Sequence, residues 1–163
     1  MSRAEREGRL RELDQELRNL STRSVFFHQA VADRLKLSVL DLNCLDALIT
    51  QGPMTAGRLT EVNGVTTGAI TGVIDRLEKA GFVRRDRDPN DRRRVIVTPL
   101  PNLEAQIFPL FAGLSGALSE LAEKYSDDEL AVIVDFVRAA GPITHEQITR
   151  LRAERKGAGR VKK

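Results

Sequence analysis

The chain has 163 residues, enough for one compact domain of moderate size or for a small lobe with helical attachments. Charged residues make up 30% and aromatic residues 4%, which favours exposed helices over a sheet sandwich, and the net charge of +3 does not by itself indicate a polyanionic partner. The single cysteine excludes an internal disulfide, and the absence of a leading or long apolar run predicts a cytoplasmic protein without a signal peptide or membrane span.

Leucines recur near the N-terminus at alternating spacings of three and four residues, with charged residues between them. The members of this stripe are Leu10, Leu13, Leu17 and Leu20. The spacing predicts an amphipathic helix that continues to Leu35, with an apolar stripe too narrow for burial in a core. We therefore expect residues 1–36 to form a dimerisation helix, although an intramolecular seam would use the same stripe.

The middle of the chain contains start and stop signals for two short helices. Ser38 and Asp41 form a capping-box pattern, and Gly52 is suited to a left-handed C-cap before Pro53, which cannot continue the helix. Thr55 is placed to cap the next helix, which we expect over residues 56–61.

A longer helix follows, from a cap at Thr66 or Thr67 to a stop at Gly81. Its inward face is predicted from the helical spacing of Ala69, Ile70, Val73, Ile74, Leu77 and Ala80. The outer face of its first half carries small and polar residues, including Gly68 and Gly72, and each glycine costs a helix up to about 1 kcal/mol relative to alanine. Close approach to a surface would explain both glycines, and so would close packing against another helix.

Two β-branched segments around a polar loop predict a hairpin after this helix, with strands at residues 82–85 and 94–98. A helix pair followed by a basic hairpin suits DNA, because the second helix can enter the major groove while an arginine at the hairpin tip enters the minor groove. We expect Asp91 to orient a neighbouring arginine, and we place the tip at Arg92, Arg93 and Arg94. A solvated charged hairpin without a ligand is the plainer reading.

The remaining chain is predicted to be helical after a junction at Pro99 and Pro101. We expect one helix over residues 103–125 with Pro109 as a kink or late start, a second from Ser126 to a stop at Gly141-Pro142, and a third from Thr144 to Lys156. Residues 101–156 would complete the dimerisation region, and residues 157–163 would form a disordered basic tail. The predicted fold class is mainly α with a small β-hairpin wing: a winged helix-turn-helix lobe over residues 37–100 plus a helical dimerisation region.

Residues 38–98 closely resemble the MarR (multiple antibiotic resistance regulator) family of bacterial transcription factors. The matching strings are Gly52-Pro53-Met54-Thr55, Val65-Thr66-Thr67-Gly68-Ala69-Ile70-Thr71, Asp75-Arg76-Leu77-Glu78-Lys79-Ala80-Gly81-Phe82-Val83 and Asp88-Pro89-Asn90-Asp91-Arg92-Arg93. The resemblance implies a homodimeric repressor or activator on a pseudo-palindromic operator in double-stranded DNA, often released by a small aromatic or phenolic ligand. It implies that the major-groove face includes Thr66, Thr67, Thr71 and Arg76. It also implies that Arg92 and Arg93 lie in the wing.

The same resemblance suggests an effector site where the first helix meets the second and the fifth. The candidate lining residues are Phe27, His28, Cys44 and Phe111. Some relatives of the family sense oxidants through a cysteine, but the leucines around Cys44 favour a buried, inert thiol, and His28 could equally be an ordinary interface residue.

No metal-ligand cluster, phosphate loop or catalytic constellation stands out, so we expect no cofactor and no enzyme. The alternative to a DNA-binding regulator is a winged-helix protein-interaction module without specific DNA binding.

Overall fold

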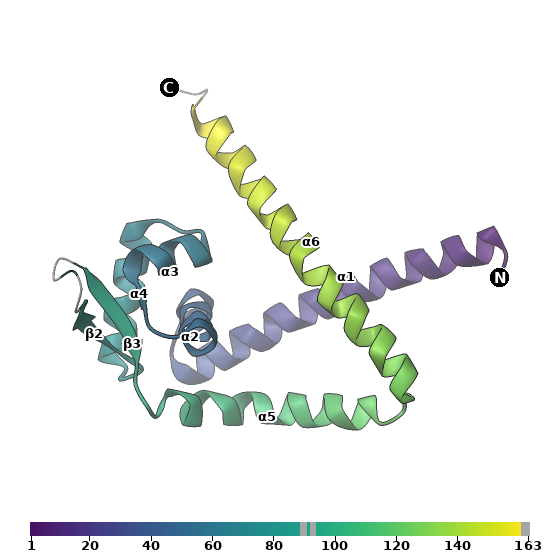
Figure 1. Cartoon of the computed structure of the whole chain (residues 1–163), viewed down its shortest axis with the longest axis horizontal. Coiled ribbons are helices and arrows are strands. Elements are labelled where there is room, and N and C mark those ends of the chain that lie inside the picture. Colours follow the sequence, from purple (N-terminus) through teal and green to yellow (C-terminus); the bar gives the residue numbers. More distant parts are fainter. Residues whose placement is uncertain (89–90, 92–93, 161–163) are drawn as a thin grey trace. The chain divides into compact units, whose positions relative to one another are not determined.

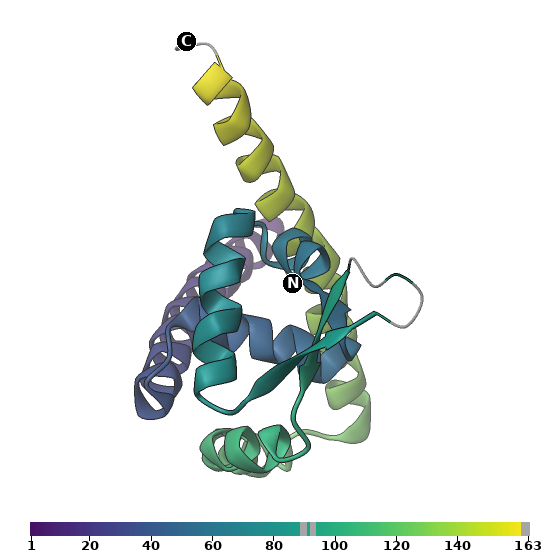
Figure 2. The ribbon, with the colours of Figure 1, turned by 90° about the vertical axis from the view of Figure 1, so that its left-hand side faces the viewer.

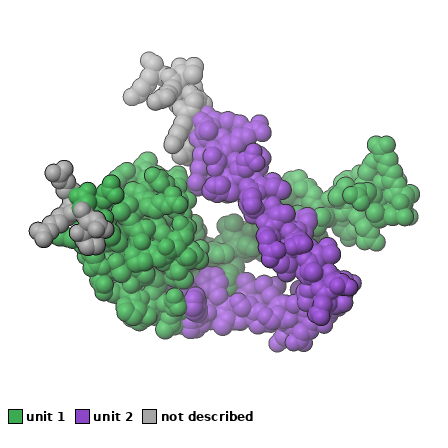
Figure 3. Space-filling model, viewed as in Figure 1, with its two compact units in different colours: residues 1–106 green, residues 107–163 purple. Residues whose placement is uncertain are grey.

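The computed structural model describes residues 1–88, 91 and 94–160, with side chains described as far as residue 154. The chain forms two compact units, with the boundary between Gln106 and Ile107, and each is described by itself (Figure 3). The elements appear in Figure 1 and run in the order α1 Arg3–Leu35, α2 Val39–Gln51, β1 Met54–Thr55, α3 Ala56–Asn63, α4 Thr67–Lys79, β2 Val83–Arg87, β3 Val95–Pro99, α5 Leu103–Ala122 and α6 Asp127–Arg160. The predicted class, mainly α with a small β component, is confirmed.

The first helix begins earlier than the leucine stripe. Ser2 caps it: its hydroxyl accepts a hydrogen bond from the Glu5 N–H, and its own N–H donates to the Glu5 carboxylate. Only Val31 and Ala32, near its C-terminal end, are buried, where α1 packs against α2. The four leucines of the stripe are 41–60% exposed, so they make no buried seam within the described part of the first unit.

Three of the predicted helix caps are present in the first unit. The Ser38–Asp41 capping box closes at both of its hydrogen bonds, and the Thr55 and Thr66 hydroxyls accept from the N–H three residues on. Gly52 has positive φ as expected, but its ψ of −173° is extended and not left-handed helical. The reason is Pro53, which excludes helical ψ from the residue before it and directs the chain into β1.

The predicted hairpin is confirmed as β2 paired antiparallel with β3, which places Arg85 opposite Val97. The structure adds a third strand, β1, on the other side of β3, where Met54 lies opposite Val97. The two-residue β1 is too short to show any periodicity in the sequence. Figure 2 shows β2 and β3 as two arrows that project from the helical part of the lobe.

The core of the first unit lies between α2, α3, α4 and the sheet. Its most deeply buried apolar side chains include Leu45, Leu48, Leu59, Ile70, Val73, Leu77, Val83 and Val97. The predicted inward face of α4 is therefore correct at its four central positions. It is wrong at Ala69 and Ala80, which are exposed because they lie in the first turn and at the C-cap, beyond the packed middle of the helix.

The C-terminal helices differ from the prediction at their prolines. Pro109 lies inside α5, so it does not delay the helix start, and α5 ends three residues earlier than predicted. The predicted stop at Gly141-Pro142 is wrong, because α6 continues through Pro142 as one helix of 34 residues. A proline removes one backbone hydrogen bond, which the turns on either side of it can tolerate in a long helix.

Thr144 has no capping role in this continuous helix, because its hydroxyl donates to the Ala140 carbonyl at 2.9 Å. The helix reaches Arg160, so the predicted disordered tail begins too early, and residues 161–163 lie outside the described residues. None of the helices described here combines the length and hydropathy that a membrane span requires.

Candidate nucleic-acid interface

Helix α4 has one buried face and one open face. Thr67, Gly68 and Thr71 are exposed and Gly72 is half-buried. The two glycines lie opposite the buried stripe from Ile70 to Leu77, and the two threonines lie beside it. The Thr71 hydroxyl donates to the Thr67 carbonyl at 3.0 Å, which leaves its oxygen able to accept a hydrogen bond from a ligand. The predicted small, polar outer face is therefore present in the first half of α4.

The two glycines of this face have no packing role inside the described part of the chain. A Cβ built on Gly68 meets no atom within 4 Å, and a Cβ on Gly72 meets only the Arg76 Nη1 atom at 3.5 Å. The alternative that these glycines allow another helix to pack closely is wrong for the described residues. Their smallness leaves open space in front of the helix.

Arg76 lies one turn beyond Gly72, but its guanidinium has a protein partner that the sequence did not suggest. Its Nε donates to Asp41 Oδ2 at 3.1 Å and its Nη2 donates to Asp41 Oδ1 at 2.6 Å. Asp41 is fully buried in the first turn of α2, whereas the Arg76 side chain is 54% exposed. Asp41 was expected only as a capping residue, and no local pattern indicates a contact across 35 positions of sequence.

A second set of charges joins α4 to the first strand of the hairpin. The Arg85 guanidinium pairs with both Asp75 and Glu78, and the Arg85 backbone N–H donates to Glu78 at 3.2 Å. These contacts raise the pKa of Arg85, and the hydrogen bond that it donates to Asp75 is the largest cause. Helix α4 is thus tied by charge to α2 at one flank and to β2 at the other.

The loop between β2 and β3 is closed by backbone hydrogen bonds. The Asp88 N–H donates to the Arg94 carbonyl at 3.1 Å, and the Arg94 N–H donates to the Asp91 carbonyl at 2.8 Å. The Asp91 carboxylate lies 3.5 Å from the Arg94 Nε, an ion pair longer than the charge-assisted hydrogen bond of the predicted orienting role. Arg92 and Arg93 lie outside the described residues.

The four predicted effector residues do not form one site within the first unit. Cys44 is fully buried, and burial, with a smaller contribution from Asp41, raises its pKa to about 11, so the thiol stays protonated at neutral pH. Phe27 and His28 are half-buried neighbours whose rings meet edge to face at 6.0 Å, and His28 Nδ1 lies 2.7 Å from the Ser24 carbonyl. Phe111 belongs to the second unit.

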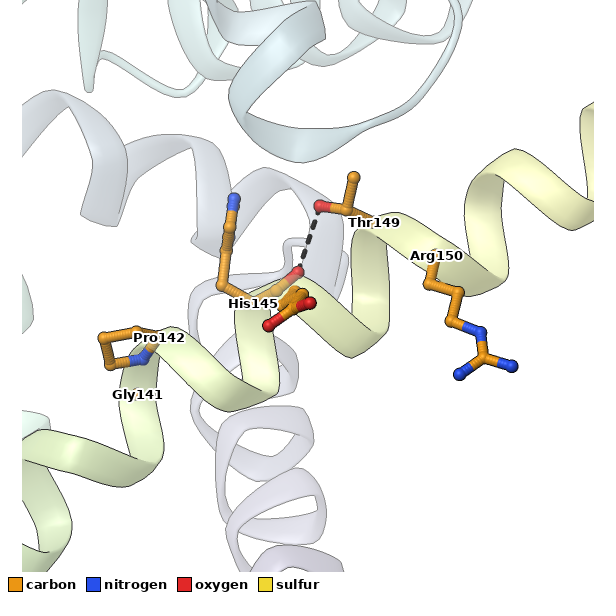
Figure 4. Close-up of a pocket in the computed structure, with 6 residues that line it drawn as sticks. Gly141, Pro142, His145, Thr149 and Arg150 are labelled. Atoms are coloured by element: carbon orange, nitrogen blue, oxygen red, sulfur yellow. Dashed lines mark hydrogen bonds between the residues drawn. The ribbon is translucent and has the colours of Figure 1, made fainter.

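Two surface hollows lie elsewhere on the chain, and neither is lined by any of these four residues. The first is lined by α6 alone, around Gly141-Pro142 and His145, where the Thr149 hydroxyl donates to the His145 carbonyl (Figure 4). The second lies between the start of α3 and the loop end of β3, around Thr55 and Arg94. Among the described residues, no group of three or more His, Cys, Asp or Glu side chains could hold a metal ion.

Comparison with known proteins gives a family match and similar folds. The family model that matches is the MarR family, over residues 37–95. An uncharacterised HTH-type transcriptional regulator of Bacillus subtilis, YcgE, is 47% identical over 135 residues, which cover 83% of this chain and 88% of that protein. The HTH-type transcriptional repressor YetL of the same organism is 30% identical over 48% of this chain and 47% of its own length.

Solved structures show the same fold. A MarR family protein from Bacillus stearothermophilus superposes with a TM-score of 0.68 at 23% identity, covering 88% of this chain and 97% of that one.

Proposed function

The chain belongs to the MarR family of transcriptional regulators, and on that premise we propose that it binds double-stranded DNA as a homodimer, with α4 in the major groove and the β2–β3 hairpin as the wing. The observation that carries this proposal is the open outer face of α4. Its first half presents threonines and glycines, with empty space in front of Gly68. A helix whose backbone must approach base edges closely needs small residues and open space of this kind.

The proposed DNA contacts divide between helix and wing. Threonine hydroxyls can bond base edges or phosphates, threonine methyls can contact a thymine methyl, and the glycines admit the backbone. Arginines of the wing can enter the minor groove, where the negative potential is enhanced, while Asp91 holds Arg94. The proposed contact residues are Thr66, Thr67, Gly68, Thr71, Gly72, Asp91, Arg92, Arg93 and Arg94.

The exposed apolar surface supports the homodimer. The leucine stripe of α1 is 41–60% exposed, and α5 and α6 add further exposed apolar side chains, among them Leu118, Val132 and Ile143. A large exposed apolar surface on a protein in water marks a site of interaction with another molecule. Two subunits would place two recognition helices on a pseudo-palindromic operator, with half-sites about 34 Å apart.

Family resemblance also supports a repressor released by a small aromatic or phenolic ligand, and the relative YetL carries the name of a repressor. Phe27, His28 and Phe111 remain the candidate ligand residues, whereas Cys44 has no exposed surface in this structure. We place the protein in the cytoplasm with its DNA target. No observation favours the protein-interaction module over DNA binding.

We expect Gly68→Ala to separate folding from DNA binding. The added methyl group meets no protein atom and alanine favours the helix by up to about 1 kcal/mol, so the stability of the fold should hold or rise. On DNA, the same methyl group should cost about 1–3 kcal/mol by overpacking, weakening binding about tenfold or more. Urea denaturation and fluorescence anisotropy on the selected operator measure the two effects. Gly8→Ala in α1 is the matched control, because its added methyl group also meets no atom. Equal operator affinity in both variants would contradict the placement of α4 in the major groove.

Arg93→Ala tests the wing. If Arg93 neutralises a phosphate or enters the minor groove, its loss should weaken operator binding and lower the slope of log affinity against log salt by about one unit. Arg6→Ala removes the same charge from exposed α1 and should leave the slope unchanged. An unaltered affinity for the Arg93 variant in a mobility-shift titration would refute the wing assignment.

A further inference from the structure

Asp41 is an unusual residue for the lobe that carries the proposed DNA-binding face. Among the described residues it is the only buried side chain that carries a charge. Both of its carboxylate oxygens are used: Oδ1 accepts from Arg76, and Oδ2 accepts from Arg76 and from the Ser38 N–H at 2.8 Å. A buried carboxylate is stable in a protein only when it is paired in this way.

The electrostatics of the pair keep it charged at neutral pH. Burial alone would raise the pKa of Asp41, but hydrogen bonds from Arg76 and Ser38 outweigh burial and hold that pKa below its usual value. The hydrogen bond to Asp41 raises the pKa of Arg76. Asp41 is therefore an ionised carboxylate, held by two nitrogens of one planar guanidinium.

The pair joins two elements with different tasks. Asp41 is also the third residue of α2 and part of its capping box, so its position is fixed by the start of that helix. Arg76 lies on α4, one turn from Gly72 and two turns from Gly68 in the proposed recognition face. A two-nitrogen contact with a carboxylate constrains direction as well as distance, so it restricts rotation and sliding of α4 against α2.

We propose that Asp41 and Arg76 are positioning residues, which hold the recognition helix α4 in its DNA-docking orientation against α2, and that Arg76 acts through Asp41 and not through a contact with DNA. The proposal rests on the proposed function. The competing assignment, that the 54% exposed Arg76 contacts a phosphate directly, predicts different behaviour for Asp41. Loss of Asp41 would then release Arg76 toward DNA, whereas under the positioning role it would misplace the helix.

The test compares the wild-type chain with Asp41→Asn, Arg76→Ala and Arg76→Lys on a duplex that the wild type selects from random-sequence DNA. We expect each variant to bind about tenfold more weakly with the salt slope unchanged, and Asp41→Asn/Arg76→Ala to bind no more weakly than Arg76→Ala alone. Binding to unselected duplex should change little. Arg76→Lys keeps the charge but not the two-nitrogen contact, so it tests the proposal even if Arg76→Ala does not fold.

The proposal is overturned if Asp41→Asn binds as well as or better than wild type while Arg76→Ala lowers the salt slope by about one unit. If the wild type selects no duplex, the proposed function fails. The positioning role of the Asp41–Arg76 pair is then tested separately by amide hydrogen exchange. Faster exchange in α4 of Asp41→Asn then supports the positioning role, and unchanged exchange in α4 overturns it.

Discussion

Leu17→Glu should yield a folded chain that no longer dimerises. Leu17 is 41% exposed in the middle of the leucine stripe of α1, so a glutamate there removes no core contact. In the proposed dimer the same carboxylate would be buried without a partner, and this costs several kcal/mol. A monomer engages one half-site at a time, so operator affinity should fall about 100-fold or more through lost avidity. Analytical ultracentrifugation and fluorescence anisotropy measure the two losses.

Gln15→Glu is the matched control for this substitution. It adds the same charge two residues away, on the opposite face of α1, where Gln15 is exposed and hydrogen-bonds Asn19. We expect it to remain a dimer with operator affinity close to wild type. A Leu17→Glu chain that sediments as a dimer would exclude the α1 stripe from the subunit interface.

Leu77→Ala should give the largest loss of stability among single substitutions in α4. Leu77 has no exposed surface and lies in the core formed by α2, α3, α4 and the sheet. Removing its branched end loses the burial of the side chain and leaves a cavity, which together cost about 2–5 kcal/mol. For a protein of ordinary stability that is a large fraction of the total. Urea denaturation followed by circular dichroism measures the free energy of unfolding.

Lys79→Ala, two residues on at an exposed position, is the control and should change the free energy of unfolding by less than about 0.5 kcal/mol. A Leu77→Ala variant within 1 kcal/mol of wild type would mean that the core around α4 collapses into the space or is not packed as described.

The sequence predicted the parts of this fold that depend on local chemistry. The caps at Ser38, Thr55 and Thr66 follow from side chains that bond an N–H three residues away, and the buried stripe of α4 follows from helical spacing. Pro142 misled the prediction, because a local rule treats a proline as a stop, whereas the turns around it sustain α6. The strand β1 could not be predicted from two residues, since it exists only through its pairing with β3.

In the candidate site, too, local features could be predicted from the sequence and contacts between distant residues could not. The glycines of α4 could be linked to close approach from the sequence, and the structure adds the empty space in front of Gly68. The partner of Arg76 could not be predicted, because Asp41 precedes it by 35 positions and its capping role already accounted for its presence. Contacts between distant residues depend on packing that no local pattern encodes.

Selection of bound sequences from a random duplex library tests whether the chain docks α4 in the major groove as a homodimer. A homodimer with α4 in the major groove should enrich an inverted repeat whose half-site centres lie about 10 base pairs, or one helical turn, apart. The Gly68→Ala chain should enrich it poorly while remaining folded. A wild-type chain that enriches no sequence and binds no duplex even at low salt would contradict the account.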